Sequence, residues 1–96
     1  MDVHAIRELV LNDRFHLTQH AQDELANENL RLDDVATALL SGEIINEDVD
    51  PDRGAEWLVE GMNWMKETIR AKVALDDEGD LIVITLYSRR QQRRTR

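Results

Sequence analysis

The spacing of apolar residues changes once along the chain, near residue 42. Before this point apolar residues recur every three or four positions, which is typical of helices. After it they alternate with polar residues or run continuously, which is typical of strands. No internal repeat, low-complexity block or linker divides the 96 residues. We therefore expect a single domain over residues 1–88, followed by a disordered, arginine-rich tail over residues 89–96.

Three helices are predicted in the first part of the chain. They cover residues 2–12, 19–28 and 31–42. Thr18 is a natural N-cap for the second helix, because its hydroxyl can accept a hydrogen bond from a backbone N–H one turn further on. Asn29 is expected to follow that helix in the left-handed conformation, which asparagine tolerates better than most residues. Gly42 ends the third helix.

Four strands are predicted in the second part of the chain. They cover residues 43–49, 55–62, 67–75 and 81–87. In the third strand, the residues expected to face the core are Ile69, Ala71, Val73 and Leu75, and those expected to face away from it are Thr68, Arg70 and Lys72. The last strand is apolar on both faces, so we expect it to be central or covered on both sides. The order of elements predicts an α+β domain, with three N-terminal helices packed on one face of a four-stranded antiparallel sheet.

The charged residues are segregated along the chain. Five of the twelve basic residues lie in the last eight positions, so residues 1–88 carry seven basic and twenty acidic side chains, a charge of −13 with histidine neutral. Such an acidic domain repels phosphate, which disfavours general binding of nucleic acids. No predicted helix has a basic face, which disfavours sequence-specific DNA binding. The arginine-rich tail is either a solubilising end or a segment that binds phosphates, an acidic partner or the domain itself.

The composition excludes several classes of protein. There is no cysteine, which excludes disulfides, thiolate metal sites and a cysteine nucleophile. No apolar stretch approaches the roughly 20 residues that a membrane span needs. The N-terminus is charged and amphipathic, unlike a signal peptide. These absences predict a soluble, cytoplasmic protein with no membrane partner.

The stretch HLTQHAQDELA, residues 16–26, contains most of the candidate chemistry. His16 and His20 are four residues apart, a spacing that suits zinc when both lie on one helix. Thr18 caps the helix between them and no third ligand clusters with them, so we expect neither a metal site nor another cofactor. A neutral His20 at a helix N-terminus is a candidate general base. The alternative, which these residues by themselves favour, is that His20 packs between helix and sheet with a ring nitrogen bonded to a backbone carbonyl.

Side chains outside this stretch have two interpretations each. Arg70 can bind a phosphate or carboxylate, or it can form a surface ion pair. Tyr87 can hydrogen-bond a substrate or simply end a half-buried strand. Trp57 and Trp64 can stack on a base, although core packing is the better interpretation for Trp57 in a chain with so few aromatic residues.

Several segments, taken in order, resemble one known family. Thr18-Gln19-His20-Ala21 is similar to a Ser/Thr-x-His-Ala motif, and NENLRLDDVATALLSGEII is similar to a helix–loop–helix–strand segment. Arg53-Gly54, WLVEG and LIVITLY are similar to a turn and two strands that follow. In this order the pieces resemble the small bacterial and archaeal family called domain of unknown function 4258, over about residues 15–87.

The resemblance implies a compact α+β fold similar to the RelE-like and barnase-like ribonucleases, and a role as the toxin of a toxin–antitoxin pair. It also implies that His20, Arg70, Thr85 and Tyr87 form a site that cleaves RNA without a metal. In such a site a base deprotonates the ribose 2′-hydroxyl, a cation stabilises the phosphorane and an acid protonates the leaving oxygen. The family has an arginine four residues after the histidine, where this chain has Glu24, and a carboxylate repels the phosphorane.

Two functions follow as hypotheses. The first is a non-catalytic binding module that retains a toxin-like fold and binds a protein partner, a cognate antitoxin or another protein, through its acidic surface or its arginine-rich tail. The alternative is a metal-independent endoribonuclease toxin, and RNA is expected as a ligand only in that case.

Overall fold

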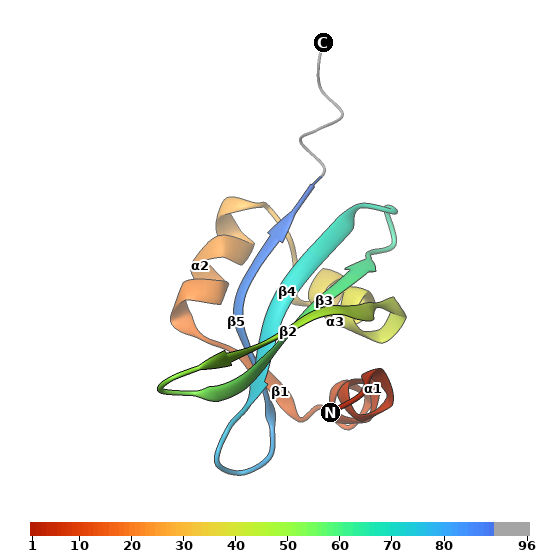
Figure 1. Cartoon of the computed structure of the whole chain (residues 1–96). Coiled ribbons are helices and arrows are strands. Elements are labelled where there is room, and N and C mark those ends of the chain that lie inside the picture. The colour runs from red at the N-terminus through yellow and green to blue at the C-terminus, as the bar shows by residue number, and fades with distance from the viewer. Residues whose placement is uncertain (90–96) are drawn as a thin grey trace.

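The computed structural model describes residues 1–89, which form three helices and five strands (Figure 1). In chain order the elements are α1 (Val3–Leu11), β1 (Phe15–Leu17), α2 (Gln19–Asn27), α3 (Leu32–Ser41), β2 (Glu43–Asp50), β3 (Gly54–Met62), β4 (Thr68–Leu75) and β5 (Leu81–Ser88). The predicted α+β class and the three helices are confirmed. Within residues 1–89, no helix has the length and hydropathy needed to cross a bilayer.

The sheet differs from the prediction of four antiparallel strands. It has five strands in the order β1-β5-β4-β3-β2, and β1 runs parallel to β5, with Phe15 opposite Leu81 and Leu17 opposite Val83. The remaining pairs are antiparallel, as predicted. The prediction missed β1 because three residues are too short to show an alternating pattern. Its parallel partner, β5, also lies near the other end of the chain, so no pattern of neighbouring residues predicts the pairing.

The helix ends follow from local hydrogen bonds that the sequence predicts. The Thr18 hydroxyl accepts a hydrogen bond from the backbone N–H of Ala21, at 3.1 Å, and so caps α2. At the other end Asn29 adopts a left-handed conformation with φ of 59°, and the next N–H, of Leu30, donates to the Leu25 carbonyl. The capping prediction for Thr18 and the conformation expected of Asn29 are both confirmed.

The core lies between the sheet and the helices. α3 packs on β3 and β4, α1 packs on α3, and α2 lies beside β5 (Figure 1). The residues of β4 expected to face the core include Ile69, Ala71 and Val73, and these are all buried. Leu75 is 41% exposed instead, because it is the last residue of β4. Trp57 is buried, and its indole N–H donates to the carboxylate of Glu47 on the neighbouring strand.

A glycine allows α3 to lie directly on β3. A Cβ atom added at Gly61 would stand 1.9 Å from the carbonyl oxygen of Ala38, a residue of α3. No side chain fits in that space, so the backbones of the helix and the strand meet at this point. The C-terminal half of α3, and the loop that leads into β2, depend on this close approach.

We expect Gly61→Ala to lower the free energy of unfolding by about 1–3 kcal/mol, because α3 must move away from β3 to accept the new methyl group. Urea denaturation of the purified variant measures the loss. Gly54→Ala is the matched control: Gly54 has φ of 85° but no heavy atom within 4 Å of an added Cβ, so only backbone strain of about 1–2 kcal/mol is expected. Unaltered stability of Gly61→Ala would show that this contact does not constrain the fold.

Candidate functional site

α2 covers the edge of β5 that β1 leaves open. β1 pairs only with residues 81–83, so among residues 1–89 no strand lies beside the second half of β5 on that side. The chain turns into α2 at this point, and Thr18 is the first residue to bond to β5 in place of a strand. Its backbone N–H donates to the Val83 carbonyl at 3.0 Å, and its hydroxyl donates to the Ile84 carbonyl at 2.9 Å. Thr18 therefore caps the helix and continues the edge pairing with one side chain.

Glu24 completes the edge one turn further along α2. Its Oε1 atom accepts hydrogen bonds from the backbone N–H of Leu86 at 2.8 Å and from the Thr85 hydroxyl at 2.6 Å. Glu28 follows on the same helix and accepts from the Ser88 hydroxyl at 2.7 Å. An edge N–H needs an acceptor, and a guanidinium has only donors. The carboxylate of Glu24 thus does structural work that an arginine at the same position cannot do.

His20 lies on the solvent side of this arrangement. Its Nε2 atom is 3.3 Å from Oε2 of Glu24, and its side chain is 69% exposed. The interpretation that His20 packs between helix and sheet against a backbone carbonyl is therefore wrong. His20 contacts Thr85 only indirectly, because the two side chains share the carboxylate of Glu24.

Arg70 and Tyr87 lie opposite each other on β4 and β5. Arg70 donates from Nε to the Glu60 carboxylate at 2.8 Å, and its Nη1 atom is 3.5 Å from the Tyr87 hydroxyl. The hydrogen bond with Tyr87 and that with Glu60 raise the pKa of Arg70 above its ordinary value. Glu60 stands opposite Arg70 on β3, so the three side chains form a row across the sheet. Sequence reasoning missed Glu60, because its position beside Arg70 depends on the register between two strands.

Three of the four candidate residues, Arg70, Thr85 and Tyr87, lie on neighbouring positions of β4 and β5. Thr85 is opposite Lys72 and Tyr87 is opposite Arg70, so both pairs lie on the sheet face that points away from the core. A β-bulge at Ile84 precedes them, since Val83 and Thr85 oppose consecutive residues of β4. The structure therefore places one guanidinium and two hydroxyls on one face, and His20 is linked to them only through the carboxylate of Glu24 and Thr85.

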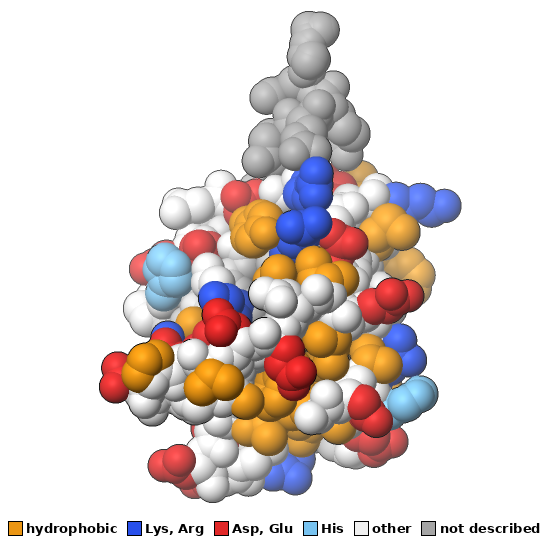
Figure 2. Space-filling view, in the orientation of Figure 1, with side chains coloured by type: hydrophobic (Ala, Val, Ile, Leu, Met, Phe, Trp, Pro, Cys, Tyr) orange, Lys and Arg blue, Asp and Glu red, His pale blue; other side chains and the backbone are white. Residues whose placement is uncertain are grey.

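Carboxylates neutralise the cations of this face. Lys72 Nζ is 3.8 Å from one oxygen of Glu56, and Arg53 donates from Nε to the other oxygen at 3.0 Å. Glu56 is only 5% exposed, which is consistent with a buried charge that has two cationic partners. Arg70 is paired with Glu60 in the same way. On the face seen in Figure 2, acidic and basic side chains accordingly lie side by side rather than in separate patches.

Residues 17–88 match the family described as Domain of unknown function (DUF4258). The chain belongs to this family. No curated protein and no solved structure matches the chain. The DUF4258 span contains α2, α3 and almost the whole sheet, together with His20, Arg70, Thr85 and Tyr87, whereas α1 precedes it.

The two histidines of residues 16–26 lie on different elements. His16 immediately precedes the DUF4258 span, and His20 lies within it. His16 is in β1, with Nε2 3.9 Å from a carboxylate oxygen of Asp76, and His20 is in the first turn of α2. Within residues 1–89, one group of three side chains has the spacing of a cation site, and neither histidine is part of it. The group comprises Asp76, Glu78 and Asp80.

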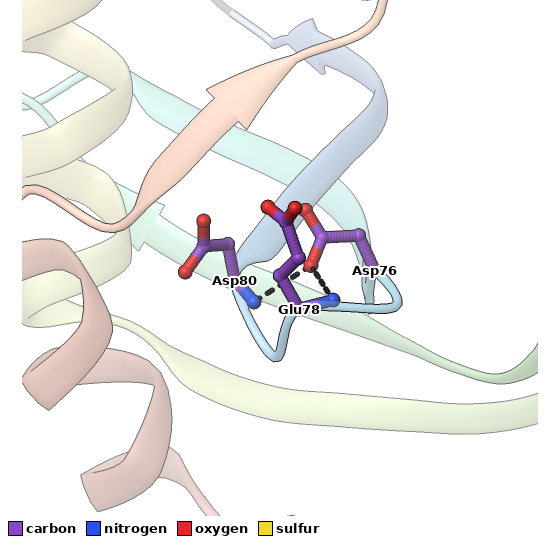
Figure 3. A group of neighbouring side chains, drawn as sticks. All are labelled: Asp76, Glu78 and Asp80. Atoms are coloured by element: carbon purple, nitrogen blue, oxygen red, sulfur yellow. Dashed lines mark hydrogen bonds between the residues drawn. The ribbon is translucent and has the colours of Figure 1, made fainter.

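Hydrogen bonds inside the β4–β5 turn account for this acidic group (Figure 3). Asp76 Oδ1 accepts from the backbone N–H groups of Glu78 and Asp80, at 2.9 and 2.8 Å. Arg14 donates to the Asp80 carboxylate at 2.6 Å. Gly79 adopts a positive φ of 82° in this turn. The carboxylate of Asp76 therefore shapes the hairpin, and that of Asp80 joins it to Arg14 in the segment before β1.

A groove of about 650 Å³ lies at the other end of the sheet. We call it the tip groove. It is lined by the ends of β2 and β3 and by the β3–β4 loop, including Glu43, Glu60, Trp64, Lys66 and Thr68. Trp64 is 77% exposed, in contrast to buried Trp57. Sequence reasoning did not find the tip groove, because only the conformation of the β3–β4 loop brings Trp64 beside the ends of the strands.

We expect Glu24→Ala to lower the free energy of unfolding by about 1–3 kcal/mol, because the edge N–H of Leu86 then loses its acceptor. Hydrogen exchange at the Leu86 amide should accelerate in parallel. Glu24→Gln keeps an acceptor oxygen and should lose less, and Asp23→Ala on the same helix is the control for helix propensity. Equal stability of Glu24→Ala and Asp23→Ala would mean that Glu24 does not hold this edge.

Proposed function

We propose that this chain is a non-catalytic binding module that recognises a positively charged segment of a protein partner. The observation that carries the proposal is the open, acidic edge of the sheet at β2. A cognate antitoxin, which the family resemblance implies, is a partner of this kind.

The two edges of the sheet differ in what covers them. α2 covers the edge of β5, whereas β2 has β3 on one side and no strand among residues 1–89 on the other. Most of the side chains of β2 are exposed, and four of them are acidic: Glu43, Glu47, Asp48 and Asp50. Open backbone groups at an edge can pair with an added strand. The carboxylates repel β2 of a second copy and attract a basic segment.

The pairing of the cations supports binding over catalysis. Arg53, Arg70 and Lys72 each have a carboxylate within 4.0 Å, so a phosphorane would compete with charges that are already in place. Glu24, at the position of the family's arginine, is bonded to β5. A protein segment with its own positive charges needs none of these cations.

The binding hypothesis predicts that the double variant Glu47→Gln, Asp48→Asn binds a partner about tenfold more weakly, because each exposed ion pair contributes up to about 1 kcal/mol. The partner would be captured from an extract of the source cells, purified and recombined with the variants, and titration calorimetry at two salt concentrations would give the affinity. Both substitutions keep an acceptor oxygen. The control, Glu8→Gln with Asp77→Asn, removes two charges away from β2. Equal affinities for the double variant and the wild type would contradict the proposal.

A metal-independent ribonuclease is the second candidate, favoured by Arg70, Thr85 and Tyr87 on one sheet face and by His20, which shares the carboxylate of Glu24 with Thr85. In that mechanism His20 would remove the proton of the ribose 2′-hydroxyl and Arg70 would stabilise the phosphorane. Both side chains first have to leave their carboxylate partners, which are Glu24 and Glu60.

Because of these ion pairs, we expect neither the wild type nor His20→Ala to cleave RNA, with or without EDTA. The assay uses both proteins purified side by side, so that a contaminating nuclease appears equally in both. Cleavage by the wild type alone, unchanged by EDTA, would establish the ribonuclease and assign His20 to its site.

A further inference from the structure

The described chain ends beside the tip groove. The backbone N–H of Arg89 donates to the carbonyl of Thr68 at 3.0 Å, and Thr68 lines the groove. The expected tail lies outside the described residues from position 90 onward. The described chain thus ends at the end of β5, with β4 between it and β3.

The remaining seven residues are long enough to cross the groove. Neighbouring strands lie about 4.8 Å apart, so β2 is about 14 Å from β5, three strand spacings away. Seven extended residues span up to about 23–25 Å. The segment 90–96 can therefore pass from Thr68 over the end of β3 and reach Glu43, the first residue of β2.

The chemistry of the segment and of the groove is complementary. The sequence of residues 90–96, RQQRRTR, contains four arginines. The groove presents the carboxylates of Glu43 and Glu60 and the exposed ring of Trp64, on which a guanidinium can stack. Lys66 also lines the groove and adds a positive charge that opposes the binding of arginine. Glu60 is already bonded to Arg70. Glu43 pairs with no cation within residues 1–89, so it is the carboxylate with capacity for a new ion pair.

We propose that the arginine-rich segment 90–96 docks in the tip groove of its own chain, with an arginine stacked on Trp64 and another paired with Glu43. Docking covers the apolar rim of the groove and lowers the negative charge at the start of β2. A second consequence rests on the proposed function: a basic partner segment that adds to β2 has to displace this one.

Trp64 reports on this docking without any partner. The chain has two tryptophans, and Trp57 is buried, so acrylamide quenches mainly Trp64, and Trp64→Phe gives the background. The full chain is compared with a chain that ends at Arg89, which keeps the hydrogen bond to Thr68. We expect the quenching constant to increase at least twofold on truncation. Excess synthetic peptide RQQRRTR should restore the lower value at low salt and fail to do so at high salt.

Two variants of the full chain test the contacts. Glu43→Gln should raise the quenching constant towards that of the truncated chain, and Asp77→Asn, which removes the same charge in the β4–β5 turn, should leave it unchanged. Identical quenching of full and truncated chains would overturn the proposal. Protection that increases with protein concentration, together with a dimer in sedimentation velocity, would assign the groove to the segment of a second copy and also overturn it. Neither result bears on binding at β2, which is measured with the partner and the Glu47 and Asp48 variants.

Discussion

The backbone of β5 beyond Val83 needs hydrogen-bond partners, and α2 supplies them. At the start of the helix Thr18 donates hydrogen bonds to the carbonyls of Val83 and Ile84. Further along the helix Glu24 accepts a hydrogen bond from the N–H of Leu86. An unpaired N–H buried under a helix costs about 1–3 kcal/mol, so the position of α2 is set by these bonds as well as by its apolar face. The arrangement also presents His20 to solvent and holds the Thr85 hydroxyl against a carboxylate.

The carboxylate of Glu24, which bonds to β5, also alters the charge of the candidate site. The family resemblance implies an arginine at the position of Glu24, which would add positive charge near a bound phosphate. Here a carboxylate accepts two hydrogen bonds from β5, and two further glutamates pair with the cations of the neighbouring strands. Electrostatic stabilisation of a phosphorane requires donors that are free to meet the developing charge. This face has the residue types of such a site, but its charges are balanced internally.

The proposed binding function rests on the difference between the two edges of the sheet. One edge is sealed by a helix, and the other carries a row of carboxylates along an exposed strand. Charged edges prevent a sheet from pairing with copies of itself, and in the proposed function the same charges would attract a basic partner. The chain's own positive charge is concentrated beyond residue 88, and the chain leaves the domain beside a groove that begins at this acidic edge.

Local patterns in the sequence were sufficient for the α+β class, the three helices, the cap at Thr18 and the left-handed Asn29, since each depends on residues within one or two turns. The four antiparallel strands were predicted for the same reason, and the two faces of β4 follow from simple alternation up to Leu75 at its end. Only the tertiary structure decided that Phe15–Leu17 is a fifth, parallel strand, because its partner lies more than sixty residues away and three residues have no periodicity. It also decided the state of the candidate site. That Glu24 bonds to β5, and that Glu56 and Glu60 stand beside Lys72, Arg53 and Arg70, depends on strand register and helix placement, which no spacing along the chain encodes.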